Sequence, residues 1–202
     1  MIISDKERQA PTSLNDAEPS HLARYEFASQ FCRKNFTVLD VPSGGGYGVE
    51  LLSKFSQEVY GIDIFEPAVA HANEFFGGSN KHFLVGDAET LSRSLPPSIK
   101  FDLITSFEGI EHFRNPGKFL VEINDLLTNE GKIIISTPRK PHGSPYHLNE
   151  FSLEDYKKLL GQYLVIESFW GQIFTDIFDL SIRPENPHAY NRFNFIAVCK
   201  KR

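Results

Sequence analysis

A glycine-dense turn between an apolar strand and an amphipathic helix constrains this chain more than any other feature. Residues 38–41 are apolar enough for a buried strand, and residues 44–48 (Gly-Gly-Gly-Tyr-Gly) turn the chain. The apolar residues of 49–55 then recur with helical spacing. Glycine permits positive φ and a close approach to the backbone, and a helix N-terminus offers N–H groups to an anionic group. The segment therefore predicts a cofactor site where the strand meets the helix.

Two common cofactor motifs do not fit this turn. The G-x-G-x-x-G string of dinucleotide folds is not met, because apolar residues occupy the third glycine position in either register. The G-x-x-x-x-G-K-[ST] string of phosphate-binding loops does not occur in the 202 residues. The string that does occur is D-x-P-x-G-x-G, which runs from Asp40 through Pro42 and Gly44 to Gly46.

This string resembles motif I of the class I S-adenosylmethionine-dependent methyltransferases, usually D-x-G-x-G-x-G, with Pro42 where the family has its first small residue. A second strand, 58–64, contains Asp63, 23 residues after Asp40. That spacing is close to the one expected for an acid that binds a ribose, because both ribose hydroxyls can donate to a carboxylate. The alternative is a glycine-rich loop that only turns the chain.

Further motifs of the resembled family follow in the expected order. A third strand, 82–85, precedes Gly-Asp-Ala-Glu at 86–89, and the resemblance places Asp87 at the adenine amine. Asp87 is also a suitable N-cap for the short helix that follows, and the two roles are compatible. The resemblance thus implies S-adenosylmethionine as the cofactor. The residues expected to bind it are Tyr25, Asp40, Pro42, Gly44, Gly46, Asp63, Ile64, Asp87, Ala88, Glu89 and Phe107.

An imidazole follows the fourth strand, 101–106, in a string S-F-E-G-I-E-H that ends at His112. Strings of this form are common in the methyltransferase subgroup that modifies small molecules and glycans. Ligands of doubly wound sheets bind at the carboxyl ends of the strands, so we expect His112 to be a general base. Glu108 would share a helical face with it and hold the ring in one tautomer. The alternative is that both residues only brace the next helix.

A second polar cluster lies in a loop rich in proline and glycine after the fifth strand, 133–138. The resemblance, S-T-P followed by P-Y-H-x-x-E-F, places this loop over the acceptor, and His147 is a second candidate for a catalytic residue. His142, His147 and Glu150 lack a recognised metal-ligand spacing, so we expect no bound metal.

An amphipathic helix is predicted over 21–28, whose sequence is H-L-A-R-Y-E-F-A. In the resembled subgroup such a helix folds over the cofactor cleft. Arg24 and Tyr25 are therefore candidates near the methionine carboxylate and the reacting centre, and Tyr25 is also a candidate catalytic residue. The alternative is an ordinary packing helix in which Tyr25 forms part of a wall.

The complete pattern predicts one α/β domain with the Rossmann-like class I methyltransferase fold. Seven strands alternate with helices in a mostly parallel sheet, and the last strand is antiparallel. Residues 1–19 are polar, which predicts a flexible arm before a single domain at 20–202. Gly131 is expected to end a helix over 116–127. The segment 172–192 is longer than a hairpin needs and is expected to contribute to an acceptor lid.

The net charge of −5 argues against a dedicated nucleic-acid partner. No signal peptide or membrane span is expected, and the two cysteines suit a reduced, cytoplasmic protein. We expect a monomeric or homodimeric methyltransferase acting on oxygen or nitrogen of a small molecule, with a sugar or glycan precursor favoured. The alternatives are an aromatic or quinone-type acceptor, and a non-catalytic S-adenosylmethionine-binding regulatory protein.

Overall fold

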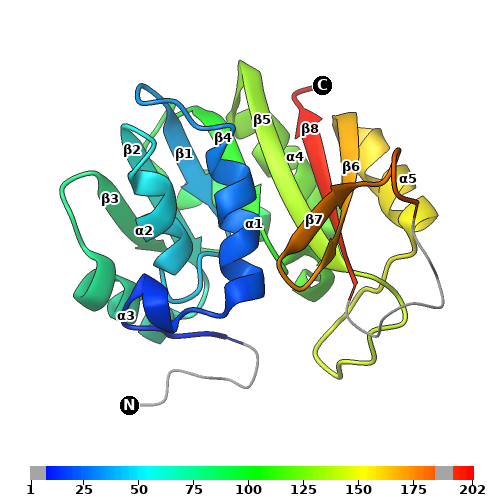
Figure 1. The fold of residues 1–202 in the computed structure, drawn as a ribbon. Coiled ribbons are helices and arrows are strands. Elements are labelled where there is room, and N and C mark those ends of the chain that lie inside the picture. Colours follow the sequence, from blue (N-terminus) through cyan, green and yellow to red (C-terminus); the bar gives the residue numbers. More distant parts are fainter. Residues whose placement is uncertain (1–7, 185–192) are drawn as a thin grey trace.

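The computed structural model describes residues 8–184 and 193–202 and contains one eight-stranded sheet (Figure 1). The strands are β1 (Thr37–Asp40), β2 (Glu58–Asp63), β3 (Lys81–Val85), β4 (Phe101–Ser106), β5 (Leu127–Pro138), β6 (Val165–Ile173), β7 (Asp176–Asp179) and β8 (Asn194–Lys200). Their order is β3-β2-β1-β4-β5-β8-β6-β7. Strands β1 to β5 pair in parallel, and β8 runs antiparallel to both of its neighbours. The mostly parallel sheet is confirmed.

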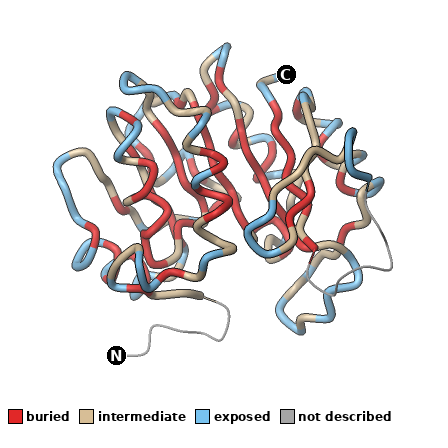
Figure 2. The backbone as a smooth tube through the Cα atoms, in the orientation of Figure 1, coloured by how far each residue is buried: buried red, intermediate tan, exposed pale blue. Residues whose placement is uncertain are grey.

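Helices cover both faces of this sheet. They are α1 (Pro19–Ser29), α2 (Tyr47–Ser53), α3 (Glu66–Phe76), α4 (Pro116–Leu126) and α5 (Leu153–Tyr163), with the 3₁₀ turns η1 (Leu14–Asp16), η2 (Ala88–Arg93) and η3 (Ile110–His112). One apolar cluster joins the sheet to α1, α2 and α3, and a second joins it to α4 and α5. Figure 1 shows α1 and α2 in front of the sheet and α4 behind it. The central strands between these layers are the most buried part of the chain (Figure 2).

Helix α4 illustrates how the sequence determines this packing. Its buried residues Phe119, Leu120, Ile123 and Leu126 recur at intervals of one, three and three residues, so they lie on one face of the helix. Asn115 caps the helix through a hydrogen bond from the backbone N–H of Lys118. The apolar face therefore packs on the sheet, and the opposite face meets solvent.

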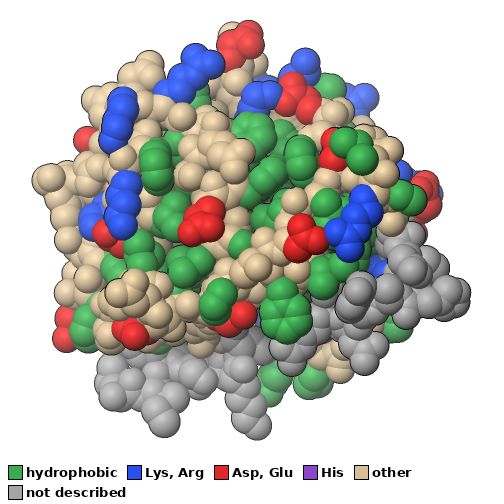
Figure 3. All heavy atoms as spheres, viewed as in Figure 1, with side chains coloured by type: hydrophobic (Ala, Val, Ile, Leu, Met, Phe, Trp, Pro, Cys, Tyr) green, Lys and Arg blue, Asp and Glu red, His purple; other side chains and the backbone are tan. Residues whose placement is uncertain are grey.

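The exposed surface carries both signs of charge. On the face that carries α1 and α2, Lys and Arg side chains are interspersed with Asp and Glu (Figure 3). The described residues contain no helix that is both long and apolar enough to cross a membrane.

The strand count differs from the expected seven because residues 173–179 form an additional hairpin. Strand β7 pairs with the end of β6, and the turn between them places Phe174 at φ 53°. Positive φ at a turn usually selects glycine or asparagine, so the sequence Phe-Thr gave no hairpin signal. The described part of the expected lid, 172–184, forms this edge of the sheet and contributes no residue to the large cavity. Residues 185–192 of that segment lie outside the described residues.

One further boundary, the end of helix α4, differs from expectation. Gly131 does not end α4, because the helix ends at Leu126 and strand β5 begins with the next residue. Gly131 lies within β5, where an added Cβ would be 2.8 Å from the carbonyl oxygen of Phe101. The residue is therefore needed for close packing of adjacent strands.

Residues 8–18 lie against the domain. The ring of His71 in α3 bonds to the carbonyl oxygen of Pro11 at 2.8 Å, and Arg8 approaches Asp63 at 3.4 Å. The flexibility of residues 1–19 stays a prediction, and residues 1–7 lie outside the described residues.

Candidate active site

A cavity of about 940 Å³ opens at the carboxyl ends of β1, β2 and β4. These strands are neighbours in the order β2-β1-β4, so the segments that follow them converge at one edge of the sheet. Helix α1 supplies another wall. Of the residues expected at the site, those that line the cavity are Tyr25, Pro42, Gly44, Asp63, Ile64, Asp87, Ala88, Glu89, Phe107 and His112. Asp40, Gly46 and His147 are not among the lining residues.

The two glycines of the turn have different surroundings. Gly44 has φ 51°, lines the cavity, and would have no atom within 4 Å of an added Cβ. Gly46 has φ 89° and is buried, and an added Cβ would lie 2.6 Å from Cβ of Ala72 and 3.0 Å from the ring of Phe83. Gly44 thus leaves space on the cavity side, whereas Gly46 allows α2 to pack closely against α3 and β3.

The carboxylate of Asp63 lies at the end of β2 and is almost completely buried. It accepts hydrogen bonds from the backbone N–H groups of Gly44 and Phe65, each at 2.9 Å. Arg8 also approaches it, at 3.4 Å. A carboxylate has about four lone-pair positions, so Asp63 still has acceptor capacity toward the cavity that it lines. This geometry suits recognition of a ribose diol.

Asp40 lies beneath the cavity at the end of β1 and is fully buried. Its Oδ1 accepts a hydrogen bond from Thr105 Oγ1 at 2.7 Å, and its Oδ2 accepts one from the phenol of Tyr25 at 3.1 Å. Burial raises the pKa of Asp40 to about 7, although these two hydrogen bonds oppose the rise. Asp40 therefore orients Tyr25, which itself lines the cavity.

The remaining cofactor candidates also line the cavity. Asp87 is exposed and caps η2 through a bond from the N–H of Glu89 at 2.8 Å, so the expected capping role is present. Glu89 accepts a bond from the N–H of Asn115. Ile64 is 62 % exposed, which leaves an apolar surface for a flat ring, and Phe107 packs edge-on against Tyr25 at 4.9 Å between ring centroids.

Helix α1 contributes a buried cation to the cavity. Arg24 is 1 % exposed and donates from Nη1 to Oε1 of Gln172 at 2.7 Å, but its buried Nε has no hydrogen-bond partner. An unpaired donor of a buried guanidinium is costly, and an anionic ligand group would satisfy it. Arg24 is therefore well placed for a carboxylate such as that of the methionine moiety.

Two cavity residues, His21 and Tyr47, were not found by the sequence analysis. Nδ1 of His21 lies 2.9 Å from the hydroxyl of Tyr47. Burial, and then the charge of Arg24, lower the pKa of His21 to about 4, so its ring is neutral near pH 7. The helical pattern placed His21 on α1 but gave no reason to pair it with the first residue of α2.

His112 lies at the end of the 3₁₀ turn η3 and lines the cavity. Its Nδ1 is 3.2 Å from the carbonyl oxygen of Tyr146. Because a carbonyl only accepts, Nδ1 carries the proton in the neutral ring and Nε2 has the lone pair. The expected bracing by Glu108 is wrong, because Glu108 precedes a turn too short for an i, i+4 face. Its carboxylate instead accepts a hydrogen bond from Ser136 at 3.0 Å.

His147 lies beside His112, on the loop between β5 and α5. The rings of His112 and His147 are 4.9 Å apart between centroids. The ring of His142 stacks on the ring of His147, with 4.5 Å between centroids. The two candidate bases are thus brought together, although His147 stands outside the cavity lining. A third residue, Glu111, was missed: it is 1 % exposed and lies next to both imidazoles. Burial, and then the charge of Glu108, raise the pKa of Glu111 well above its ordinary range.

Comparison with known proteins also points to methyltransferases. The model of the family described as "Methyltransferase domain" matches residues 39–135, which include the glycine turn, Asp63, Asp87 and His112. A probable S-adenosylmethionine-dependent methyltransferase of Mycobacterium tuberculosis is 27% identical over 132 residues, covering 61% of this chain and 46% of that protein. A ubiquinone biosynthesis O-methyltransferase of Pseudomonas paraeruginosa is 31% identical over 103 residues, covering 50% and 44%. The chain spans about half the length of the curated relatives it matches.

Solved structures agree on the fold. The YcgJ protein of Bacillus subtilis superposes with a TM-score of 0.69 at 20% identity, covering 90% of this chain and 99% of that one. The plantazolicin methyltransferase BpumL, solved in complex with SAH, superposes with a TM-score of 0.67 at 18% identity, covering 93% and 87%. Residues 39–135 thus match a methyltransferase family, and the chain has the fold of solved methyltransferases and is similar to S-adenosylmethionine-dependent relatives.

Proposed function

We propose that this protein transfers the methyl group of S-adenosylmethionine to a hydroxyl oxygen of a small molecule, with a sugar or glycan precursor as the favoured acceptor. The observation that carries the proposal is the position of His112. Its Nδ1 donates to the Tyr146 carbonyl, which places the lone pair of the neutral ring, the proton-accepting atom of a general base, on Nε2 of a residue that lines the cavity.

The cavity has the size and the chemistry for a donor and an acceptor together. A volume of about 940 Å³ lies at the upper end of the range for one drug-sized ligand, about 300–1,000 Å³. Three features fit the donor: the open side of Gly44, the carboxylate of Asp63, and the unpartnered Nε of Arg24. When bound, S-adenosylmethionine supplies a methyl group on a positively charged sulfur.

The acceptor is then expected at the end of the cavity lined by His112, Arg114 and Tyr146. Methyl transfer requires an in-line approach of the acceptor atom, so these residues act by positioning it. A hydroxyl must also lose its proton, which Nε2 of His112 can accept, whereas an amine only has to arrive uncharged. An imidazole at this end therefore favours oxygen over nitrogen as the methylated atom.

Charge supports a small acceptor over a nucleic acid. The net charge is −5, and basic and acidic side chains are interspersed on the face shown in Figure 3. A nucleic-acid partner usually requires a continuous basic surface. The second candidate is an aromatic or quinone-type acceptor, which the similarity to a ubiquinone biosynthesis O-methyltransferase supports.

The test is an acceptor screen with a donor labelled on the transferred methyl group. Sugars and sugar nucleotides, quinols and catechols, and small amines form the three arms. Label on a sugar hydroxyl is the expected result, label on a quinol would establish the second candidate, and label on an amine would overturn the choice of oxygen. Tight binding of S-adenosylhomocysteine with no transfer in any arm would instead indicate a non-catalytic binding protein.

A further inference from the structure

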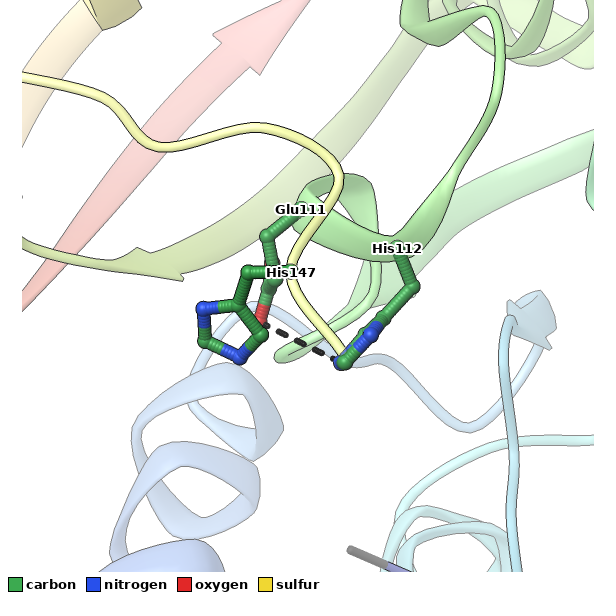
Figure 4. A group of neighbouring side chains, drawn as sticks. All are labelled: Glu111, His112 and His147. Carbon is green, nitrogen blue, oxygen red and sulfur yellow. Dashed lines mark ion pairs between the residues drawn. The ribbon is translucent and has the colours of Figure 1, made fainter. Parts of the chain in front are cut away.

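Three potential metal ligands converge beside the cavity, one of which, His112, lines it. One ligand atom each of Glu111, His112 and His147 lies within 4.8 Å of the other two. Figure 4 shows the three side chains pointing toward one another, with Glu111 and His112 on the short turn after β4 and His147 on the loop after β5. One carboxylate and two imidazoles form a donor set that suits first-row divalent metals.

Only one of the two carboxylate oxygens of Glu111 has a hydrogen-bond partner. Glu111 is 1 % exposed, and Oε2 accepts a hydrogen bond from Thr137 at 3.1 Å. Oε1 is buried and has no hydrogen-bond partner. A buried unpaired oxygen is rare in folded proteins and often marks the position of an ion or water. The unpartnered atom is the one that faces His112, with 4.0 Å between Oε1 and Nε2.

The ring of His112 is oriented as metal-binding imidazoles are. Nδ1 donates to the Tyr146 carbonyl at 3.2 Å, which leaves the lone pair on Nε2. Such an outer hydrogen bond is the usual way in which a ligand imidazole is fixed and made more basic. Two acceptor atoms, Nε2 and Oε1 of Glu111, therefore face each other, and a cation between them would attract both.

The loop that carries His147 is fastened to the same turn. The backbone N–H groups of Leu148 and Asn149 both donate to the carbonyl oxygen of Glu111, each at 2.9 Å. The side chain of Asn149 donates to the carbonyl oxygen of Phe113 at 2.8 Å. These backbone hydrogen bonds hold the loop of His147 against the turn of Glu111, 36 positions earlier in the sequence. The fold itself therefore brings the two side chains together.

We propose that Glu111, His112 and His147 bind a divalent first-row transition-metal ion beside the acceptor. The proposal rests on the function proposed above, because the cation's task is to bind the acceptor hydroxyl. Metal–ligand bonds of about 2.1 Å place tetrahedral ligands about 3.4 Å apart, so the side chains move together slightly on binding. Three protein ligands leave a further coordination position, as in catalytic metal sites.

The cation changes the role of His112. Nε2 binds the metal, and the hydroxyl coordinated at the open position loses its proton to solvent because the positive charge stabilises the oxyanion. That oxygen forms the new bond to the methyl carbon, while the carbon–sulfur bond breaks and its electron pair stays on sulfur. The sulfonium becomes a neutral thioether, so charge and atoms balance.

Metal binding can be measured without any acceptor. The full chain, freed of metal with a chelator, is titrated with Co²⁺ while its visible absorption is recorded, and Zn²⁺ is then used to displace the Co²⁺. We expect saturation at one equivalent. Glu111→Gln, His112→Ala and His147→Ala should each weaken Co²⁺ binding by at least about tenfold to a hundredfold. Mutation of a residue that only hydrogen-bonds to a metal ligand already lowers metal affinity by that factor.

His142→Phe is the matched control. It keeps a ring stacked on His147 but removes an imidazole from the same loop, so Co²⁺ affinity should stay within about twofold. The proposal is overturned if the wild type gives no Co²⁺ spectrum, or if the three ligand variants bind as tightly as the wild type. Binding of S-adenosylhomocysteine, measured on the same samples, separates the two hypotheses. If S-adenosylhomocysteine binds normally but no metal binds, only the proposed cation site is wrong. If S-adenosylhomocysteine does not bind, the proposed methyltransferase function is wrong.

Discussion

The hydroxyl of Tyr25 donates a hydrogen bond to Oδ2 of Asp40 at 3.1 Å, and so joins helix α1 to the end of strand β1 under the cavity. The acceptor carboxyl is fully buried, and its pKa is raised to about 7 because burial outweighs its hydrogen bonds. Residues 15 positions apart in the sequence thus share one buried polar contact, and that contact has a pH dependence.

We predict that Asp40 makes the protein less stable as the pH rises from about 4 to about 7. The native carboxyl titrates near 7 and an unfolded one near 3.8, so the native state holds the extra proton in this window. The stabilisation is complete below the unfolded pKa and is lost as the pH passes the native one. Asp40→Asn removes this titration and keeps an oxygen acceptor. Urea unfolding from pH 4 to 8 should show wild-type stability falling relative to the variant, and parallel curves would contradict the assignment.

A second prediction separates the two glycines of the turn. Gly46→Ala should lower the free energy of unfolding by about 2–5 kcal/mol, because positive φ costs about 1–2 kcal/mol and overpacking against Ala72 about 1–3 more. Gly44→Ala should cost only the conformational part, about 1–2 kcal/mol, but should weaken binding of S-adenosylhomocysteine. Gly143→Ala, also at positive φ with open space around it, controls for backbone strain without the cavity. Equal effects at Gly44 and Gly143 on ligand affinity would mean that the turn does not bind the cofactor.

Much of the fold could be predicted because its signals are local. The apolar periodicity of α4 and the apolar run of β5 each act within a dozen residues. The hairpin at Phe174 could not, because its turn lacks the residues that favour positive φ. Gly131 was misread because a close contact with a neighbouring strand depends on tertiary packing.

The residues of the site likewise divide into those that local sequence could predict and those that depend on tertiary contacts. Residues that follow a parallel strand directly, such as Asp63 and His112, could be placed because strand ends define the binding edge. Glu111 could not be singled out from the sequence. What distinguishes it is its burial and a carboxylate oxygen without a hydrogen-bond partner, and both depend on the folded structure. The bracing of His112 was assigned to Glu108 on helical spacing, but a backbone carbonyl from a loop 34 residues away fills that place. Contacts from distant loops leave no periodic signal.

A third prediction tests the ribose contact. Asp63→Asn keeps the size of the side chain and one oxygen that can accept from the backbone, but it removes the charge. A charge-assisted hydrogen bond contributes about 1.5–3 kcal/mol, so affinity for S-adenosylhomocysteine should fall about tenfold to a hundredfold by calorimetry. Asp125→Asn makes the same change of charge on the exposed surface and should leave affinity unaltered. If both variants bind like the wild type, the ribose does not contact Asp63.

The last prediction concerns turnover. His112→Ala should lower the rate of methyl transfer by about a hundredfold to ten-thousandfold, whether Nε2 takes the proton directly or binds a cation. Affinity for S-adenosylhomocysteine should change little, because the proposed function assigns His112 to the acceptor and assigns Asp63 and Gly44 to the donor. Single-turnover rates with saturating donor measure the chemical step alone. Added Zn²⁺ or Mn²⁺ then distinguishes the two roles: stimulation of the metal-free wild type with no effect on His112→Ala supports a ligand, and a wild-type rate that a chelator leaves unchanged supports a free base. Near-normal turnover of the variant would remove His112 from the chemistry.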